Sequence, residues 1–370
     1  MREGGVMLKF ALRRIGASLL ILLGTTVFIY ALLLAAPGGP EQKYANNPRF
    51  TPQQQQAYVK ALGLDKPVPV QYCRWLGACR RDADGIEALI GPTGFPSILP
   101  AFISGVNTGI VHGDFGYSYE NGNAVIERIS GALLPTLILA GLSAALWLSL
   151  AVILGVVTAL RNGGLFDNLV SVFTYVIAAF PTFILGFALI SIFSVGLGIT
   201  PVSGMTDGRL SPAFGSDAYW VYFSQNPGIA IADLASHLIL PVATLVTISV
   251  AGDARYVRQS VMESMGMEHV RTARSKGLSS LRINRRHILR TGLIPFATNI
   301  GLAFPFLVSG ALITETIFSW PGIGRLTLIA IGNLDYPLLM GILSIGAAAV
   351  AIGNLISDLL YAVLDPRVRL

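Results

Sequence analysis

The sequence ISGALLPTLILAGLSAALWLSLAVILGVVTAL, at residues 129–160, runs for 32 residues without a charged side chain. A membrane-spanning helix needs about 20 mostly apolar residues, and a charge at the centre of the bilayer costs roughly 2.5 to 3.5 kcal/mol. This stretch can therefore cross a bilayer as one helix. The composition agrees, because 53% of the 370 residues are hydrophobic and only 12% are charged. We predict an all-α integral membrane protein.

Five other uncharged runs that we assign to spans lie at residues 15–40, 168–206, 234–252, 291–314 and 336–357. The run at 168–206 is long, but GLGITP at 196–201 breaks its helical pattern and leaves one span followed by a loop. The run at 234–252 ends at Asp253, so we expect its helix to project beyond the bilayer into the basic segment that follows. The sequence therefore predicts six transmembrane helices.

The first uncharged run follows Lys9, Arg13 and Arg14, as a secretion signal would. It is longer than the apolar region of a signal peptide, and the AAP sequence at 35–37 is a poor cleavage site. We expect an uncleaved anchor helix.

The basic residues predict the orientation of the chain. Four Lys or Arg residues precede the first span, nine lie between Arg255 and Arg290, and only single arginines occupy the two short loops of the opposite face. Positive residues favour the cytoplasmic side of a membrane. We therefore expect both termini and the basic loop to be cytoplasmic, in a multi-pass protein of the bacterial inner (plasma) membrane.

This orientation divides the chain into three parts. Residues 1–40 form the N-terminal tail and first span, residues 41–128 an extracytoplasmic lobe, and residues 129–370 the other five spans with a cytoplasmic loop at 255–290. Cys73 and Cys79 both fall in the lobe, where an oxidising compartment permits a disulfide, although two free thiols are also compatible with the sequence. The two cysteines and His112 do not suffice for a metal site.

The chain lacks the signatures of an enzyme. No phosphate-binding loop occurs, and Gly-Ile-Gly at 322–324 is not a dinucleotide fingerprint. The intramembrane candidates for a proton pathway are Asp253 and His237, and both lie near the ends of predicted spans. No cofactor is expected in this chain. It has the features of a transport pathway whose energy source is another subunit.

The basic segment VRTARSKGLSSLRINRRHILR, at 270–290, has apolar residues at roughly helical spacing and seven Lys or Arg residues. Gly277 interrupts the pattern and Ser279 or Ser280 can cap a new helix, so we predict two short helices joined by a tight turn. Attraction to anionic lipid headgroups explains the charge but not the interrupted apolar stripe, which a protein groove would require. Nucleic acid is not expected, because no aromatic platform accompanies the charge.

Several motifs occur in order along the chain: APGGP (36–40), LGLDKP (62–67), GDFGYS (113–118), HVRTARSKGLS (269–279), RHILR (286–290), ETIFSWPGIGR (315–325), DYP (335–337) and LDPR (364–367). Together they resemble the dipeptide and oligopeptide permeases among the binding-protein-dependent ABC importers. The general loop pattern of such permeases has Glu-Ala-Ala where this chain has RTA at 271–273, a variation shared by the peptide type. The stretch 77–112 is longer than this resemblance suggests; it could contact a binding protein, shape substrate access or be inert.

The resemblance implies a fold like the type I ABC importer permeases and a set of partners. These are a second, similar permease subunit, two ABC ATPase subunits that bind ATP and Mg, and an extracytoplasmic substrate-binding protein, with membrane lipid around the spans. It also implies an ATPase-coupling loop comprising Arg271, Thr272, Ala273, Lys276, Gly277, Leu278, Ser279 and Leu281. Among these, Gly277 forms the turn, and a short helix beginning near Leu278 docks into the ATPase.

The turn after the fifth span has two interpretations. Its residues could form an outer gate or a re-entrant turn that serves packing, and the composition favours packing. They are Glu315, Trp320, Pro321, Gly322 and Gly324. Peptide is the leading cargo, while nickel chelates, glutathione and antibiotic peptides use similar permeases. A stand-alone channel, a secondary carrier and a membrane-anchored scaffold are the competing classes.

Overall fold

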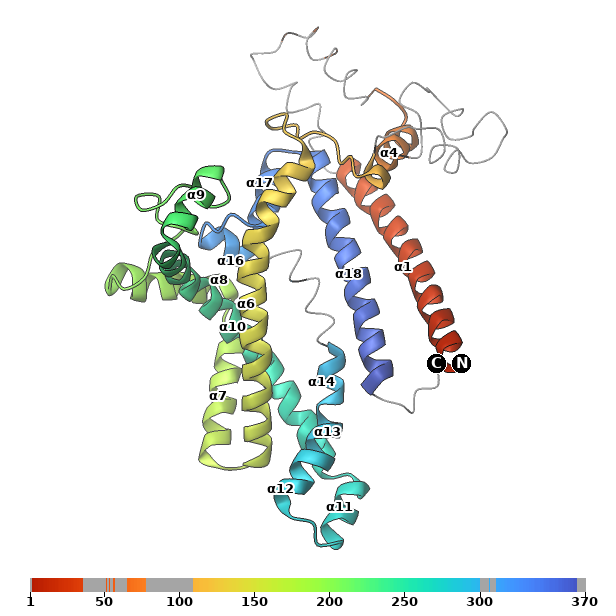
Figure 1. Ribbon diagram of the computed structural model, residues 1–370, viewed down its shortest axis with the longest axis vertical. Coiled ribbons are helices and arrows are strands. Elements are labelled where there is room, and N and C mark those ends of the chain that lie inside the picture. Colours follow the sequence, from red (N-terminus) through yellow and green to blue (C-terminus); the bar gives the residue numbers. More distant parts are fainter. Residues whose placement is uncertain are drawn as a thin grey trace. The chain divides into compact units, whose positions relative to one another are not determined.

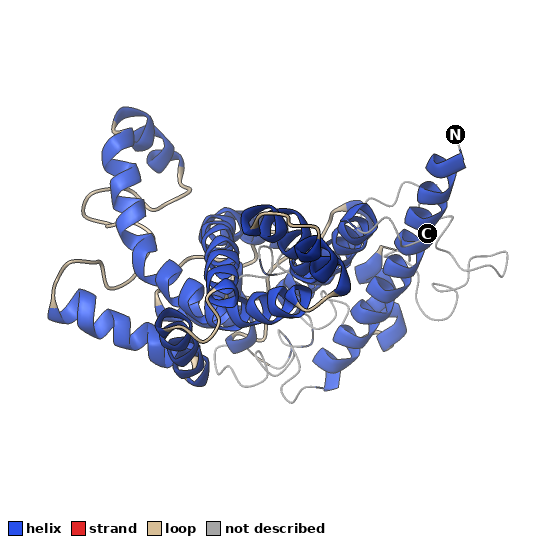
Figure 2. Cartoon of the chain, turned by 90° about the horizontal axis from the view of Figure 1, so that it is seen from below, coloured by secondary structure: helices blue, strands red, loops and turns tan. Residues whose placement is uncertain are grey.

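The computed structural model describes residues 2–35, 51, 53, 56, 65–77, 109–299, 306 and 311–364. Helices dominate these ranges, and none of them contains a strand, although Tyr117 and Ala124 form one isolated bridge (Figure 2). The predicted all-α class is confirmed for this part of the chain. Most of the predicted lobe, including residues 78–108, lies outside it.

Within the described ranges, four helices are long and apolar enough to cross a membrane (Figure 1). They are α1 (Arg2–Ala35), α6 (Val125–Leu160), α10 (Pro227–Met265) and α18 (Tyr336–Leu364). Helices α6, α10 and α18 contain the predicted spans at 129–160, 234–252 and 336–357, and α1 covers residues 15–35 of the span predicted at 15–40. Of the predicted span at 291–314 the structure describes residues 291–299, 306 and 311–314, which include α14 (Ile294–Asn299) and the start of α16 (Leu312–Ile317). Its continuity therefore stays a prediction.

The predicted third span is broken. Helix α7 (Leu165–Ala179) is followed by α8 (Thr182–Leu189) and the π-helix η3 (Ile190–Gly196), and the two halves are bent by 103°. Phe180 is extended, with φ −83° and ψ 129°, because the proline at 181 disfavours the helical conformation of the residue before it. The expected end at Gly196 is correct, but the sequence analysis missed this bend.

Helix α10 continues well past the predicted span at 234–252. It has 39 residues, and at 1.5 Å per residue it is about 58 Å long, roughly twice the hydrocarbon thickness of a bilayer. As predicted, it runs through Asp253 without a break and leads to the basic segment. The predicted core span and the residues up to Met265, just before the basic segment, are therefore parts of one helix, which has Pro241 inside it.

The remaining described helices are short. They are α4 (Val68–Leu76), η2 (Ile110–His112), α9 (Asp217–Gln225), α11 (Glu268–Ser275), α12 (Ser280–Ile283), the π-helix η4 (Asn284–Ile288), α13 (Leu289–Gly292) and α17 (Ile323–Gly332).

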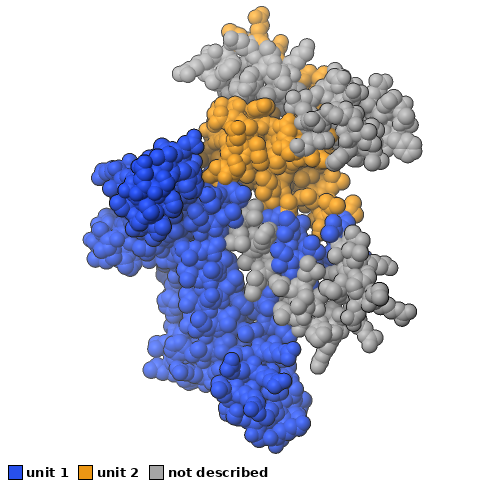
Figure 3. All heavy atoms as spheres, in the orientation of Figure 1, with its two compact units in different colours: residues 1–16, 133–325, 349–370 blue, residues 17–132, 326–348 orange. Residues whose placement is uncertain are grey.

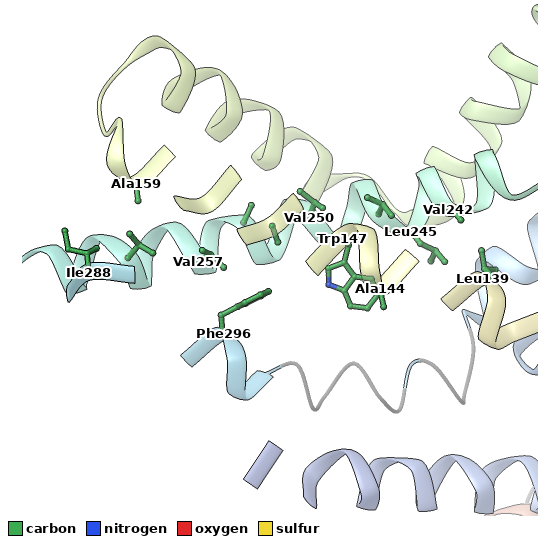
Figure 4. Packing of buried hydrophobic residues seen from close by; sticks show 14 of the residues in the cluster. Leu139, Ala144, Trp147, Ala159, Val242, Leu245, Val250, Val257, Ile288 and Phe296 are labelled. Atoms are coloured by element: carbon green, nitrogen blue, oxygen red, sulfur yellow. The ribbon is translucent and has the colours of Figure 1, made fainter. Parts of the chain in front are cut away.

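The chain forms two compact units (Figure 3). Unit 1 comprises residues 1–16, 133–325 and 349–370, and unit 2 comprises residues 17–132 and 326–348. The apolar core of unit 1 lies mainly between α6 and α10, where Trp147, Leu245 and Val257 are buried (Figure 4). It extends along α10 to the helices of the basic segment.

Unit 2 brings two of the sequence motifs together. Ser118, the last residue of GDFGYS, donates a hydrogen bond to the buried carboxylate of Asp335, the first residue of DYP. Arg128 forms an ion pair with the same carboxylate at 3.3 Å and donates to the Ser118 hydroxyl at 2.8 Å. These motifs are therefore parts of one polar network.

Helix α4 packs against α1 within unit 2. The hydroxyls of Tyr72 and Thr26 are 2.9 Å apart, and Tyr30 donates to the Gln71 amide oxygen at 3.1 Å. Cys73, also on α4, is buried and disulfide-bonded. Cys79, the other cysteine of the chain, lies outside the described residues.

Candidate functional site

The basic segment folds into two short helices, α11 and α12, joined by a turn at Gly277 (Figure 1). We call residues 268–283 the basic hairpin. Gly277 has φ +71°, its N–H donates to the Arg274 carbonyl at 3.0 Å, and the Leu278 N–H donates to the Ala273 carbonyl at 3.3 Å. This pair of bonds is a Schellman motif, which needs a left-handed residue and therefore favours glycine. The predicted helix–turn–helix is confirmed.

The apolar side of the basic hairpin faces inward. Val270 is 0% exposed, and Ala273 and Ile283 are also buried in the core of unit 1. The chain that follows is tied to α10 by Ser264, whose hydroxyl donates to the Ile288 carbonyl at 3.0 Å. The hairpin is therefore braced against the end of the long helix.

The opposite side carries the charges. Its exposed cations are Arg271, Arg274, Lys276 and Arg282, and Arg285 and Arg286 of the following η4 are also exposed. Leu281, on α12, is 68% exposed among them. Leu278 is only partly exposed and packs against the core, so the apolar residue that the hairpin presents outward is Leu281.

The remaining predicted loop residues have local roles. The Thr272 hydroxyl donates to the Glu268 carbonyl at 3.0 Å, and Arg271 forms an exposed ion pair with the Glu268 carboxylate at 2.9 Å. Such exposed pairs contribute little stability, about 0 to 1 kcal/mol. Ser279 precedes α12 in the N-cap position, but its side chain makes no capping hydrogen bond.

The second group of predicted residues lies in the turn at 315–325, which we call the tryptophan turn. Glu315 is 0% exposed. Its carboxylate accepts hydrogen bonds from the Thr136 hydroxyl at 3.0 Å, the Arg325 N–H at 3.0 Å and the Ala311 N–H at 3.3 Å. A buried carboxylate with several donors fixes the backbone around it.

Trp320 completes this turn. Its indole N–H donates at 2.8 Å to the carbonyl of Pro135, which lies inside α6. A Cβ added at Gly322 would lie 2.4 Å from Glu315 Oε2. Pro321 is exposed, while Gly322 and Gly324 are buried. The geometry thus agrees with the packing interpretation of this turn.

One polar contact was missed by sequence reasoning. Asp167, at the start of α7, is buried and forms a bidentate pair with Arg258 of α10, at 2.7 and 2.8 Å. Arg258 also donates to the Asn162 side-chain oxygen at 2.9 Å. The ion pair joins α10 to the start of α7, and the bond to Asn162 joins it to the turn between α6 and α7. The charges alone could not reveal it, because 91 residues separate the two partners.

Comparison with known families identifies the class of protein. Residues 151–370 match the family described as binding-protein-dependent transport system inner membrane component, and residues 7–94 match the N-terminal component of such transport systems. The chain belongs to this family of membrane permeases. The match covers α10, the basic hairpin and the tryptophan turn.

Three relatives align over almost the whole chain. The oligopeptide transport system permease protein AppB of Bacillus subtilis is 32% identical, over 98% of this chain and 100% of its own length. The di/tripeptide transport system permease protein DppB of Pseudomonas aeruginosa is 34% identical, over 98% of this chain and 99% of its own. The dipeptide transport system permease protein DppB of Escherichia coli is 32% identical, with the same two coverages.

Proposed function

We propose that this chain is one transmembrane half of an ATP-driven importer of di- or oligopeptides. The observation that carries the proposal is the full-length similarity to permeases named for peptide transport, since the motifs, helices and basic hairpin of this chain all fall within the aligned length. No described feature favours nickel chelates or glutathione as cargo. A stand-alone carrier is also disfavoured, because family members are components of binding-protein-dependent systems.

The basic hairpin is the proposed contact with the ATPase subunits. Protein interfaces combine an apolar anchor with a polar rim, and Leu281 surrounded by cations has this composition. Attraction to lipid headgroups would need the cations but not a rigid turn at Gly277. Because the hairpin is braced against α10, a push on its outer side moves a helix that also forms the core of unit 1.

The proposed cycle follows from that connection. ATP and Mg bind to the two partner ATPases, which close, displace the hairpins and rock the paired permease helices from inward-facing to outward-facing. Shifting such an equilibrium from 1:99 to 99:1 requires about 5.5 kcal/mol of differential binding. Diffuse headgroup attraction acts in both states and cannot supply this difference. A shape-specific contact between the hairpin and the ATPase can supply this difference.

The remaining partners belong to the same proposal. A second permease subunit completes the pathway, and an extracytoplasmic binding protein delivers peptide to it. Both termini and the basic hairpin are placed in the cytoplasm, as the distribution of basic residues predicts. The spans at 15–40, 129–160, 168–206, 234–252, 291–314 and 336–357 make six crossings, with the third one bent.

Gly277→Val tests the coupling. A β-branched residue at φ +71° is strained and removes the Schellman turn, so the binding-protein-stimulated ATP hydrolysis of the reconstituted complex should fall at least tenfold. Membrane insertion and assembly should stay normal. Gly208→Val is the control, because Gly208 is exposed and an added Cβ would meet nothing. Stimulated hydrolysis within twofold of the unsubstituted complex would refute the coupling role.

A further inference from the structure

Asp253 is an acidic residue of α10 that the coupling role does not use. Its side chain is half-buried beside the core of unit 1, and Oδ2 accepts a hydrogen bond from the Trp147 indole N–H at 3.1 Å. Among the described residues this is its one hydrogen bond, and no cation pairs with it. Oδ1 is left without a protein donor in that part of the chain.

The other buried acids of unit 1 differ from it. Asp167 accepts from a guanidinium and a backbone N–H, and Glu315 accepts from a hydroxyl and two backbone N–H groups. Asp233 accepts from a backbone N–H and lies 3.2 Å from the His237 ring. Those three acids are structural, since protein groups satisfy them. Asp253 is the exception.

The neighbouring arginines do not neutralise Asp253. Arg255 donates to the Ala251 carbonyl at 2.8 Å, and its guanidinium lies over the Tyr175 ring, 4.8 Å from the centroid. Arg258 is held by Asp167. A carboxylate in a mostly apolar helix bundle, with its nearby cations otherwise engaged, is expected to have a function and a partner from outside the chain.

The surroundings of Asp253 indicate what that partner is. Trp147, which points into the core in Figure 4, forms an edge-to-face pair with Phe306, with ring centroids 5.4 Å apart. A carboxylate beside an indole ring suits an ammonium group, which bonds to the oxygen and is attracted by the face of the ring. Gly252, the preceding residue of α10, is exposed, and an added Cβ there would meet nothing within 4 Å.

We propose that Asp253, oriented by Trp147, binds the protonated amino terminus of the peptide as it passes along the translocation pathway. This inference rests on the proposed function, and it names a recognition site within it. One Oδ atom is fixed by the indole, and the other is free to accept the ammonium. Other bound cations, such as the side chain of a lysine in the cargo, would use the same chemistry, so the test places the reporter at the amino terminus.

The test uses the whole complex in proteoliposomes, with the binding protein at saturation. A tripeptide whose first residue is photo-leucine is imported and irradiated, and the cross-linked residues are mapped by mass spectrometry. Uptake and ATP hydrolysis are measured in parallel for Asp253→Asn, Asp253→Glu and the exposed control Asp217→Asn. Asparagine keeps an acceptor for the Trp147 indole, so the local fold is retained while the charge is lost.

We expect adducts on α6 or α10 near Trp147 and Asp253 in the unsubstituted complex. In Asp253→Asn, peptide uptake should fall about tenfold, the loss expected for one charge-assisted bond, while stimulated ATP hydrolysis stays within twofold. Asp253→Glu should recover part of the uptake. Normal uptake by Asp253→Asn would overturn the inference, as would adducts confined to other helices of a transporting complex. Absence of peptide uptake by the unsubstituted complex would instead refute the proposed function.

Discussion

The basic hairpin and the tryptophan turn are both short glycine-containing turns, yet they are built in opposite ways. In the hairpin the apolar side chains are buried and the polar ones point outward, with Leu281 exposed among cations. In the tryptophan turn the charged group, Glu315, is the residue at the centre and is 0% exposed. The hairpin therefore presents its polar groups on the surface, whereas the turn uses its polar groups in internal hydrogen bonds.

Their glycines differ for the same reason. Gly277 has a left-handed conformation and open space around its Cα. Glycine is therefore needed there for its backbone conformation and not for lack of room. Gly322 has no positive φ. Glycine is needed there because the Glu315 carboxylate leaves no room for a Cβ. Substitution of Gly277 should change the coupling function proposed for the hairpin surface. Substitution of Gly322 should damage the fold.

The largest expected effect is that of Gly322→Ala. The added methyl would lie 2.4 Å from Glu315 Oε2 and 2.5 Å from Thr136 Oγ1. Both atoms belong to a fixed buried network, so overpacking should cost about 1 to 3 kcal/mol. We expect the melting temperature of the purified permease to fall by about 1 to 4 °C.

Gly332→Ala is the matched control for that measurement, because its added Cβ would meet nothing within 4 Å. If Gly322→Ala melted at the same temperature as this control, the description of the tryptophan turn as a packed network would be wrong.

The smallest expected effect is that of the double substitution Arg271→Gln and Arg274→Gln. Both side chains are exposed, and screened surface charges contribute about 0 to 1 kcal/mol. Stimulated ATP hydrolysis should fall less than about fivefold, and less at high salt than at low salt. A loss as complete as that of Gly277→Val would show that charge, not the shape of the turn, controls coupling.

Much of this fold could be predicted from the sequence because single-residue properties control it. Charge-free runs locate the long helices, since a bilayer excludes charges wherever they stand in the chain. The break at Gly277 was predictable because a left-handed turn selects glycine locally. The bend before the proline at 181 could also have been predicted, because a proline restricts the conformation of the residue before it, here Phe180.

The rest depends on contacts between distant residues. Glu315 is buried because Thr136 and two backbone N–H groups meet it, and Thr136 lies 179 residues away. The exposure of Leu281 rather than Leu278 depends on how the hairpin packs against α10. Spacing alone assigns both leucines to short helices or turns, and it cannot tell which one the core covers.

The central claim is that the outer side of the basic hairpin contacts a separate ATPase. It is tested most directly by placing a photo-cross-linking amino acid at Leu281 and, as a control on the same helix, at the buried Ile283. In a complex that hydrolyses ATP and imports peptide, the account predicts an adduct with the ATPase subunit from position 281 and a much weaker one from 283. Adducts from position 281 with lipid alone would contradict it.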